Sequence, residues 1–351
     1  MLEQSDMAHY LLSLGLVKPR DIVEGDFSVI DVSRRNCVFL ARRRAGDTYV
    51  IKQARPRTAQ TLAHEAAVLR VLAEVPDLAG QVPTVVRHER EAARLVLSTP
   101  GGARDWIEHH SSGRFPRVPA RILGRVLASL HRLPAEGMEG LPPGVERMWG
   151  LSLPEPPLEL LLRLSAGAQD LVARVQASRT MCDRLAELRE SDSGRGLVHG
   201  DLRWDNCLAV AAGTSGRRTR VLLVDWELAG AGAAGFDVGT MLAEYLCAWV
   251  DSIPIVDPAD PGRLVARARF PLWRMRPALH DFWSTYRQSN PEAPALRRVV
   301  QLAAVRILQT AVERAQALTF PSAHVVTLLQ LADSLLEHPD DAALGLLGLR
   351  A

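Results

Sequence analysis

The chain has 351 residues, of which 47% are hydrophobic and 23% are charged, as is ordinary for a folded protein with sizeable cores. The formal net charge of +2 gives no argument for a nucleic-acid partner, and no apolar run approaches the roughly 18 residues needed to span a bilayer. The length suits two lobes or domains.

In its first third, the sequence predicts a mixture of short strands and helices. A short helix is expected over residues 5–14, where Ser5 can cap the N-terminus and Gly15 ends the helix. A longer helix is expected over residues 58–75, because its apolar residues recur at helical spacing. Alternating apolar runs bounded by turn residues predict five strands, over residues 22–32, 37–42, 48–52, 82–88 and 94–97.

The rest of the chain is expected to be mainly helical. Apolar periodicity predicts helices over residues 105–110, 118–133, 158–164 and 169–188, and from residue 259 to the end. A segment rich in proline and glycine, residues 134–157, is either a substrate-facing insertion or a long surface loop. Two short strands, residues 207–210 and 221–224, flank a turn-like patch and predict a hairpin.

Acidic residues at fixed spacing surround this hairpin. The stretch begins V-H-G-D-L-R-W-D-N at Val198, and Asp225 comes directly after the second strand. Because a hairpin folds back on itself, we expect Asp225 to lie close to Asn206. In phosphoryl transfer one carboxylate orients and deprotonates the attacking hydroxyl, while a side-chain oxygen and a second carboxylate hold magnesium. Asp201 would be that base, and Asn206 and Asp225 would be the metal ligands.

The spacing H-G-D-x-x-x-x-N, followed by D-W-E, resembles the aminoglycoside phosphotransferase and choline-kinase-like family. An HGD tripeptide alone also arises as a chance turn, but here Asn206, Asp225 and Asp237 all stand in register with it. The resemblance implies an α+β, two-lobed, protein-kinase-like fold with a five-stranded antiparallel sheet in the N-terminal lobe and a mainly helical C-terminal lobe. It also implies an ATP- and Mg²⁺-dependent kinase that transfers the γ-phosphoryl group to an acceptor hydroxyl.

The use of lysine singles out one position in the first lobe. Only two of the 42 basic residues are lysines, and one of them, Lys52, stands in a strand-like run. A compact point charge there suggests chemistry that the planar fork of arginine does not provide. The resemblance implies that Lys52 contacts the α- and β-phosphates and that Glu65, on the following helix, forms a salt bridge to it. The alternative is that Glu65 is a solvated helix charge.

Two connections resemble the nucleotide-binding parts of a kinase. The link between the first two strands lacks the glycines of protein kinases, which is a departure. A Ser- and Asn-bearing loop could still cover the phosphates, and its residues here would be Ser33, Arg34, Arg35 and Asn36. A solvated basic turn is the alternative. The segment Ser98-Thr99-Pro100-Gly101-Gly102 stands where a kinase hinge binds adenine, although it could be an ordinary loop.

Three further residues are expected to support the site. His199 would hold the loop by packing and hydrogen bonding and would not carry a proton. Asp237 resembles the residue that opens the next helix in the family and would buttress the catalytic loop without touching substrate. Glu227 would lie near the metals or the substrate.

The acceptor has two candidate classes. Phosphorylation of an antibiotic or small alcohol is the family default. The S-R-R-N loop and the H-G-D-L-R-W-D-N stretch also resemble kinase-like proteins of class V lanthipeptide and thioamitide biosynthesis, which act on Ser/Thr of a precursor peptide beside a lyase partner. A pseudokinase that binds nucleotide and partners such a lyase is the rival class. The presence of Lys52, Asp201, Asn206 and Asp225 weighs against that rival.

We expect the lobe boundary to fall near residue 100. Residues 1–98 would form the nucleotide-binding lobe, 99–102 the hinge, and 103–351 the helical lobe with the catalytic loop and acceptor site. The four cysteines lie far apart with no C-x-x-C, which favours free thiols. The N-terminus lacks a signal-peptide layout. We therefore expect a cytoplasmic protein with no membrane or nucleic-acid partner.

Overall fold

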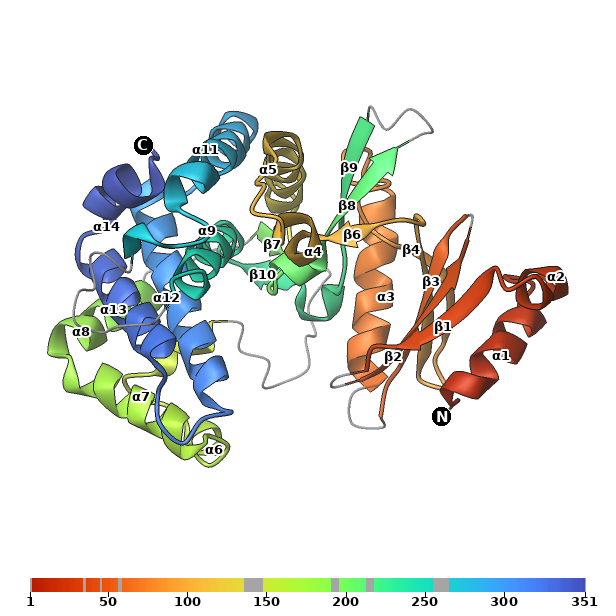
Figure 1. Ribbon diagram of the computed structural model, residues 1–351, viewed down its shortest axis with the longest axis horizontal. Coiled ribbons are helices and arrows are strands. Elements are labelled where there is room, and N and C mark those ends of the chain that lie inside the picture. The colour runs from red at the N-terminus through yellow and green to blue at the C-terminus, as the bar shows by residue number, and fades with distance from the viewer. Residues whose placement is uncertain are drawn as a thin grey trace. The chain divides into compact units, whose positions relative to one another are not determined.

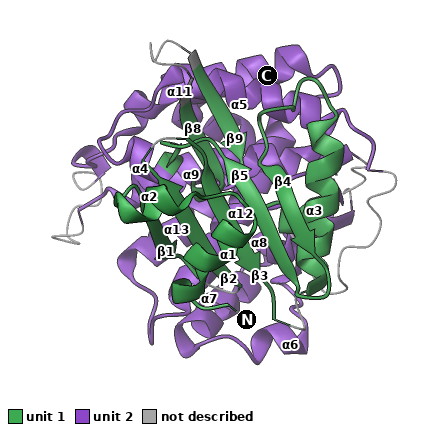
Figure 2. Cartoon of the chain, turned by 90° about the vertical axis from the view of Figure 1, so that its right-hand side faces the viewer, with its two compact units in different colours: residues 1–106, 137–145, 205–229 green, residues 107–136, 146–204, 230–351 purple. Residues whose placement is uncertain are grey.

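The computed structural model describes residues 2–33, 36–44, 46–55, 59–135, 148–190, 196–212, 218–254 and 265–350. These residues divide into two compact units (Figure 2). Unit 1 takes the described residues up to Trp106 together with those from Asp205 to Ala229. Unit 2 takes the described residues from Ile107 to Trp204 and from Gly230 onward.

A five-stranded antiparallel sheet is the centre of unit 1, with strand order β1-β2-β3-β5-β4. Its members are β1 (Phe27–Asp31), β2 (Cys37–Arg43), β3 (Thr48–Gln53), β4 (Thr84–Glu89) and β5 (Arg94–Thr99). The sheet that the sequence predicted is therefore confirmed. In β3, Ile51 pairs with Val96 of β5, and Lys52 pairs with Leu95. Since side chains alternate between the faces of a strand, Ile51 and Lys52 point to opposite sides of the sheet.

Helices cover both faces of this sheet. The helices of unit 1 are α1 (Met7–Ser13) after the 3₁₀ turn η1 (Gln4–Asp6), α2 (Pro19–Val23) and α3 (Ala59–Ala73). Met7 and Leu11 of α1 form a buried cluster with Ile51 and Val96. Helix α3 contacts β3, β4 and β5, and lies on the other side of the sheet from α1 (Figure 1). The alternation in β3 therefore directs Lys52 toward α3.

The predicted hairpin forms a second, three-stranded sheet in unit 1. Its strands are ordered β6-β8-β9, with β6 (Arg104–Asp105), β8 (Cys207–Ala212) and β9 (Arg218–Leu223). The short 3₁₀ turns η4 (Trp204–Asn206) and η5 (Trp226–Leu228) lie at its two ends. Cys207 pairs with Leu223, so the two ends of the hairpin come together beside Asn206 and Asp225.

Unit 2 is mainly helical, as predicted. Its described elements are α4 (Trp106–His110), α5 (Arg117–His131), η3 (Trp149–Ser152), α6 (Leu158–Leu161), α7 (Ala166–Ala177), α8 (Arg179–Glu190), β7 (Gly196–Val198), β10 (Gly230–Gly232), α9 (Ala234–Asp251), α11 (Leu272–Ser289), α12 (Leu296–Ala315), α13 (Ala323–Glu337), α14 (Pro339–Asp341) and the π-helical turn η6 (Ala342–Leu347). Helix α12 is buried along most of its length and packs on α7, α9 and α13. Helix α5 packs on α11, where a Cβ on Gly124 would lie 2.6 Å from the Phe282 carbonyl oxygen, so only glycine permits this approach.

Several predicted boundaries are wrong. The strand expected from residue 22 begins only at Phe27, because Pro19 opens the helix α2. The helix expected over residues 169–188 is two helices, since Ser178 takes an extended conformation between α7 and α8. Asp105 belongs to β6 and not to the following helix. Of the proline- and glycine-rich segment, residues 136–147 lie outside the described residues. Among the helices in the described part of the chain, none is both long and apolar enough to cross a membrane.

Candidate active site

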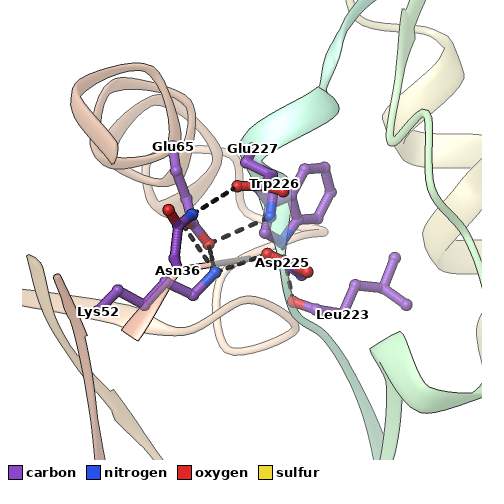
Figure 3. A network of polar contacts seen from close by, with 7 residues as sticks. All are labelled: Asn36, Lys52, Glu65, Leu223, Asp225, Trp226 and Glu227. Atoms are coloured by element: carbon purple, nitrogen blue, oxygen red, sulfur yellow. Dashed lines mark hydrogen bonds and ion pairs between the residues drawn. The ribbon is translucent and has the colours of Figure 1, made fainter. Parts of the chain in front are cut away.

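The ammonium group of Lys52 is held between two carboxylates (Figure 3). Lys52 Nζ lies 2.8 Å from each carboxylate oxygen of Glu65 and 2.6 Å from Oδ1 of Asp225. Lys52 is only 8% exposed and Glu65 is fully buried. Burial acts to lower the pKa of Lys52, but the charges of Glu65 and Asp225 outweigh it and raise the pKa above its usual value. The salt bridge expected between Lys52 and Glu65 is confirmed, and Asp225 joins it.

Glu65 also fixes the chain segment that follows β9. The Trp226 backbone N–H donates to Glu65 Oε1 at 3.2 Å, and the Trp226 indole N–H donates to the Leu223 carbonyl at 2.9 Å (Figure 3). One residue before Glu65, the ring nitrogen Nε2 of His64 lies 2.7 Å from the Ala229 carbonyl oxygen. Helix α3 therefore holds both sides of the turn that presents Asp225.

Asp225 adopts a left-handed backbone conformation with φ 68° and ψ 65°. This region costs an ordinary L-residue roughly 1–2 kcal/mol. Its carboxylate is about one-third exposed and reaches Lys52. Such strained residues are held by their surroundings and often occur at functional sites. Here the Trp226–Glu65 hydrogen bond and the hairpin hold the segment.

Asn206 lies at the other end of the same hairpin. The Val224 N–H donates to the Asn206 carbonyl at 3.0 Å, and Asn206 is 5% exposed. The pattern of a hairpin with an amide before β8 and a carboxylate after β9 was predicted, and both residues lie at its base. An amide oxygen and a carboxylate are the hard oxygen donors that Mg²⁺ prefers.

The residue types at the hairpin base fit magnesium bound with a phosphate-bearing ligand. Among the described residues, no three His, Cys, Asp or Glu side chains gather into a metal cluster. Mg²⁺ is usually held by one or two carboxylates together with water and substrate phosphates, and seldom by an all-protein cage. Asn206 and Asp225 match that sparse donor set.

The loop that carries Asp201 is anchored inside unit 2 by Asp237 on α9. Asp237 Oδ2 accepts the His199 N–H at 2.7 Å, and Oδ1 accepts the Gly200 N–H at 3.0 Å. His131 Nε2 lies 3.2 Å from Oδ2. Burial acts to raise the pKa of Asp237, but the hydrogen bonds and charges of His131 and His199 hold it below its usual value. Asp237 is thus positioned as a support for the loop.

Gly200 has φ +81°, a conformation that glycine adopts without strain. This accounts for glycine at the position where many kinases have arginine. The next residue, Asp201, donates its backbone N–H to His199 Nδ1 at 3.3 Å. Its carboxylate is about one-third exposed and lies 3.4 Å from the Arg203 guanidinium. Asp201 therefore keeps an accessible carboxylate on a loop whose backbone is fixed.

Two residues of the predicted phosphate loop are described. The Ser33 hydroxyl accepts the Val38 N–H at 3.0 Å, and the Ser33 N–H donates to Asp31 at 2.8 Å. Those Ser33 hydrogen bonds lower the pKa of Asp31. The Asn36 amide donates to Glu227 Oε2 at 3.3 Å, which joins the loop to the segment after Asp225 (Figure 3). Arg34 and Arg35 lie outside the described residues.

The two side chains expected at the hinge lie at the end of β5. Ser98 pairs with Tyr49 and Thr99 with Thr48, so both belong to the sheet. The Ser98 hydroxyl donates to Asp47 at 2.9 Å, and the Thr99 hydroxyl donates to the Thr48 carbonyl at 3.3 Å. The chain turns only after them, at Gly101 and Gly102.

One carboxylate that contacts the loop was not predicted from the sequence. Glu244 on α9 accepts the Trp204 N–H at 2.9 Å, three residues after Asp201. The sequence did contain a signal for this residue. Glu244 follows Asp237 by seven residues, and this spacing places both side chains on one face of a helix.

The predicted site residues that the structure describes fall into two groups, one in each unit. Unit 1 brings together Asn36, Lys52, Glu65, Asn206, Asp225 and Glu227, and unit 2 brings together His199, Asp201 and Asp237. Ser33, Ser98 and Thr99 also belong to unit 1, where their hydrogen bonds go to β1, β2 and β3 or the turn before β3.

Residues 27–267 match the phosphotransferase enzyme family, APH. The chain belongs to this family, and its class is that of kinases with an alcohol group as acceptor, as the catalytic stretch predicted. A comparison with curated proteins gives no sequence match.

Solved structures share the kinase-like fold at low sequence identity. The ADP-bound aminoglycoside phosphotransferase APH(2'')-Ib is 13% identical, with a TM-score of 0.51 over 95% of this chain and 99% of that chain. An ethanolamine kinase from Plasmodium vivax is 11% identical, with a TM-score of 0.52 over 94% of this chain and 86% of that chain. LicA in complex with AMP, a choline kinase from Streptococcus pneumoniae, is 14% identical, with a TM-score of 0.50 over 95% and 98%. The predicted two-lobed kinase-like fold is therefore confirmed.

Proposed function

We propose that the protein transfers the γ-phosphoryl group of ATP to an acceptor hydroxyl in a reaction that needs Mg²⁺. The observation that carries the proposal is the contact of the buried Lys52 ammonium with both Glu65 and the partly exposed Asp225. A lysine held by a helix glutamate, and a metal-binding carboxylate that follows a strand, are the parts that kinases use to bind and polarise a triphosphate.

Each of the remaining residues has a proposed role. Asp201 would accept the proton of the acceptor hydroxyl and orient it for in-line attack, and His199 and Asp237 would fix its loop. Asn206 and Asp225 would hold the metal, which when bound neutralises charge on the phosphates. Glu227 would lie close to these ligands.

The nucleotide would be bound mainly by unit 1. We propose that the phosphates lie under the loop of Ser33, Arg34, Arg35 and Asn36, with Lys52 reaching the α- and β-phosphates. The backbone near Ser98 and Thr99 would meet the base. We further propose residues 1–98 as the nucleotide-binding lobe, 99–102 as the hinge and 103–351 as the acceptor lobe. A cytoplasmic setting would supply ATP and keep the four free thiols reduced.

The acceptor that we propose is a hydroxyl compound that is not a polycation. An aminoglycoside with several ammonium groups needs clustered carboxylates to replace its lost hydration. Arg203 instead lies beside Asp201, and residues 251–351 contain ten acidic against eleven basic residues. A small neutral or acidic alcohol suits this balance of charges. So does a Ser/Thr of a precursor peptide that a lyase partner then processes.

A panel of acceptors tests the proposal. It would contain kanamycin, a neutral hydroxyl-bearing antibiotic, choline, and Ser/Thr peptides with acidic or basic flanks, each incubated with Mg·ATP at low and high salt. Mass spectrometry would detect an added phosphoryl group. We expect transfer to a neutral or acidic acceptor and little to kanamycin. Efficient phosphorylation of kanamycin that weakens with salt would contradict the acceptor proposal. Nucleotide binding without any turnover would favour the pseudokinase.

A further inference from the structure

The catalytic loop is attached to α9 at two places, seven residues apart. Asp237 accepts the N–H groups of His199 and Gly200, and Glu244 accepts the N–H of Trp204. Seven residues correspond to about two helical turns, or roughly 10 Å along the axis. Both carboxylates therefore lie on one face of the helix, and Asp201 lies between the two attachment points.

The two attachments use carboxylates in different surroundings. Asp237 is fully buried and contacts His131, whereas Glu244 is half-buried and follows one turn after Thr240. The Trp204 N–H begins the turn η4 (Trp204–Asn206), where a backbone donor has no partner within the turn itself. The Glu244 carboxylate satisfies this donor.

Side-chain packing fixes the same end of the loop. The Trp204 ring lies 4.9 Å from the Tyr245 ring in an edge-on arrangement and 4.4 Å from the His110 ring, measured between centroids. Tyr245 is the neighbour of Glu244 on α9. The backbone and the indole of Trp204 are thus both held by the same turn of one helix.

Arg306 on α12 contributes a positive charge to the surroundings of Glu244 and Asp201. Its guanidinium forms a two-fold contact with Glu313, at 2.9 and 3.2 Å. Burial acts to lower the pKa of Arg306, but the carboxylates of Glu313, Glu244 and Asp201 together raise it. Arg306 therefore remains a cation whose charge interacts with the carboxylates of both Glu244 and Asp201.

We propose that Glu244 is a positioning residue for phosphoryl transfer, because it fixes through Trp204 the end of the loop that carries Asp201. This inference rests on the proposed role of Asp201 as the base. Without the second attachment the loop would remain tied at His199 and Gly200 but could shift at Trp204. Displacing a reacting group by about 1 Å can cost on the order of 100-fold in rate.

The test compares Glu244→Ala with Glu244→Gln. The glutamine amide oxygen can still accept the Trp204 N–H, whereas alanine cannot. Steady-state transfer would be measured to the best acceptor of the panel, or to water if no panel compound accepts phosphate. We expect Glu244→Ala to lower kcat by about 10–100-fold with the KM for ATP nearly unchanged, and Glu244→Gln to recover most of that loss. Asp170→Ala, which removes a partly exposed carboxylate of α7 that pairs with Arg174, serves as the matched control and should behave like the wild type.

A second measurement reports on the loop without using activity. Hydrogen exchange of a peptide that spans residues 202–206 should be faster in Glu244→Ala than in the wild type and close to the wild-type rate in Glu244→Gln. This comparison applies to the glutamine variant even if the alanine variant folds poorly. In that case Glu244→Leu, which has a similar volume but no oxygen acceptor, replaces the alanine variant, and exchange at the wild-type rate in both non-accepting variants would overturn the inference.

The outcomes separate this inference from the proposed function. Unchanged kcat in a folded Glu244→Ala variant, or a rise only in the KM for the acceptor, would overturn the positioning role. If Asp201→Asn abolishes transfer in the same assays, the proposed function stands while the inference on Glu244 fails. If Asp201→Asn retains transfer, the role of Asp201 fails and the inference falls with it.

Discussion

Replacing Lys52 by methionine should destabilise the protein by about 3–5 kcal/mol, the usual cost of removing one partner from a buried ion pair. Methionine has a similar length but no charge. The change would leave the fully buried Glu65 carboxylate without the ammonium that now lies 2.8 Å from both of its oxygens. It would also leave Glu65 and Asp225 facing each other with no cation between them. The destabilisation follows from this uncompensated buried charge.

Urea unfolding followed by circular dichroism measures this effect, since the midpoint and slope give the free energy of unfolding. The double variant Lys52→Met/Glu65→Gln is the matched control. It removes the stranded charge, so it should be more stable than Lys52→Met alone by at least about 1–2 kcal/mol. A loss below about 1 kcal/mol in Lys52→Met, or a double variant no more stable than the single one, would refute this reasoning.

Four further predictions concern the shape of the lysine site, the loop, the metal site and a buried histidine. Lys52→Arg keeps the cation but forces a wider, planar group into a space where the ammonium has three oxygen neighbours within 2.8 Å. We expect overpacking to lower the free energy of unfolding by about 1–3 kcal/mol and turnover to fall. A variant with wild-type stability and turnover would contradict the argument from the scarcity of lysine. Asp201→Asn should leave the affinity for ATP, measured by calorimetry, nearly intact while the rate of transfer falls by about 10²–10⁴-fold. Undiminished transfer would show that Asp201 is not the base. Asp225→Ala should weaken ATP binding in the presence of Mg²⁺ far more than in its absence, and an equal loss under both conditions would remove Asp225 from the metal site. Burial, with a smaller effect of His109, lowers the pKa of His110 to about 3, so the unfolded chain binds a proton at this residue that the folded protein excludes. The contribution of His110 to stability is therefore complete above about pH 6.5 and is lost as the pH falls toward 3, at up to about 1.4 kcal/mol per pH unit. His110→Phe should show a shallower loss of stability over this range than His109→Gln, and equal slopes in acid denaturation would contradict the assignment.

The parts of the site that could be predicted are those in which chemistry requires certain residues at close sequence spacing. Asp201 and Asn206 are five residues apart, and a predicted hairpin brings Asp225 back to Asn206, so one local pattern located all three. The rarity of lysine singled out Lys52, and its ion pair with Glu65 was expected from the resemblance to the kinase-like family. The sheet was predictable because its strands alternate apolar residues between clear turns.

The parts that were missed depend on long-range packing or on local breaks in a pattern. The contact of Lys52 with Asp225 joins residues 173 positions apart, and no periodicity in the sequence predicts it. Glu244 belongs to no motif, and its seven-residue spacing from Asp237 was the one signal in the sequence. Its hydrogen bond from the Trp204 N–H depends on how the loop packs on α9. The helix break at Ser178 was overlooked because apolar residues keep their helical spacing on both sides of it. The helix α2 that begins at Pro19 was not predicted, because the apolar residues after it read as the start of a strand.

The central claim is tested most directly by following γ-labelled ATP with the purified full chain, Mg²⁺ and the acceptor panel. We predict that the label appears on the hydroxyl of one acceptor class, that transfer stops when Mg²⁺ is chelated, and that Asp201→Asn binds ATP but does not transfer the label. A wild-type protein that binds ATP and never transfers the label to any acceptor or to water would contradict the account and indicate a nucleotide-binding pseudokinase.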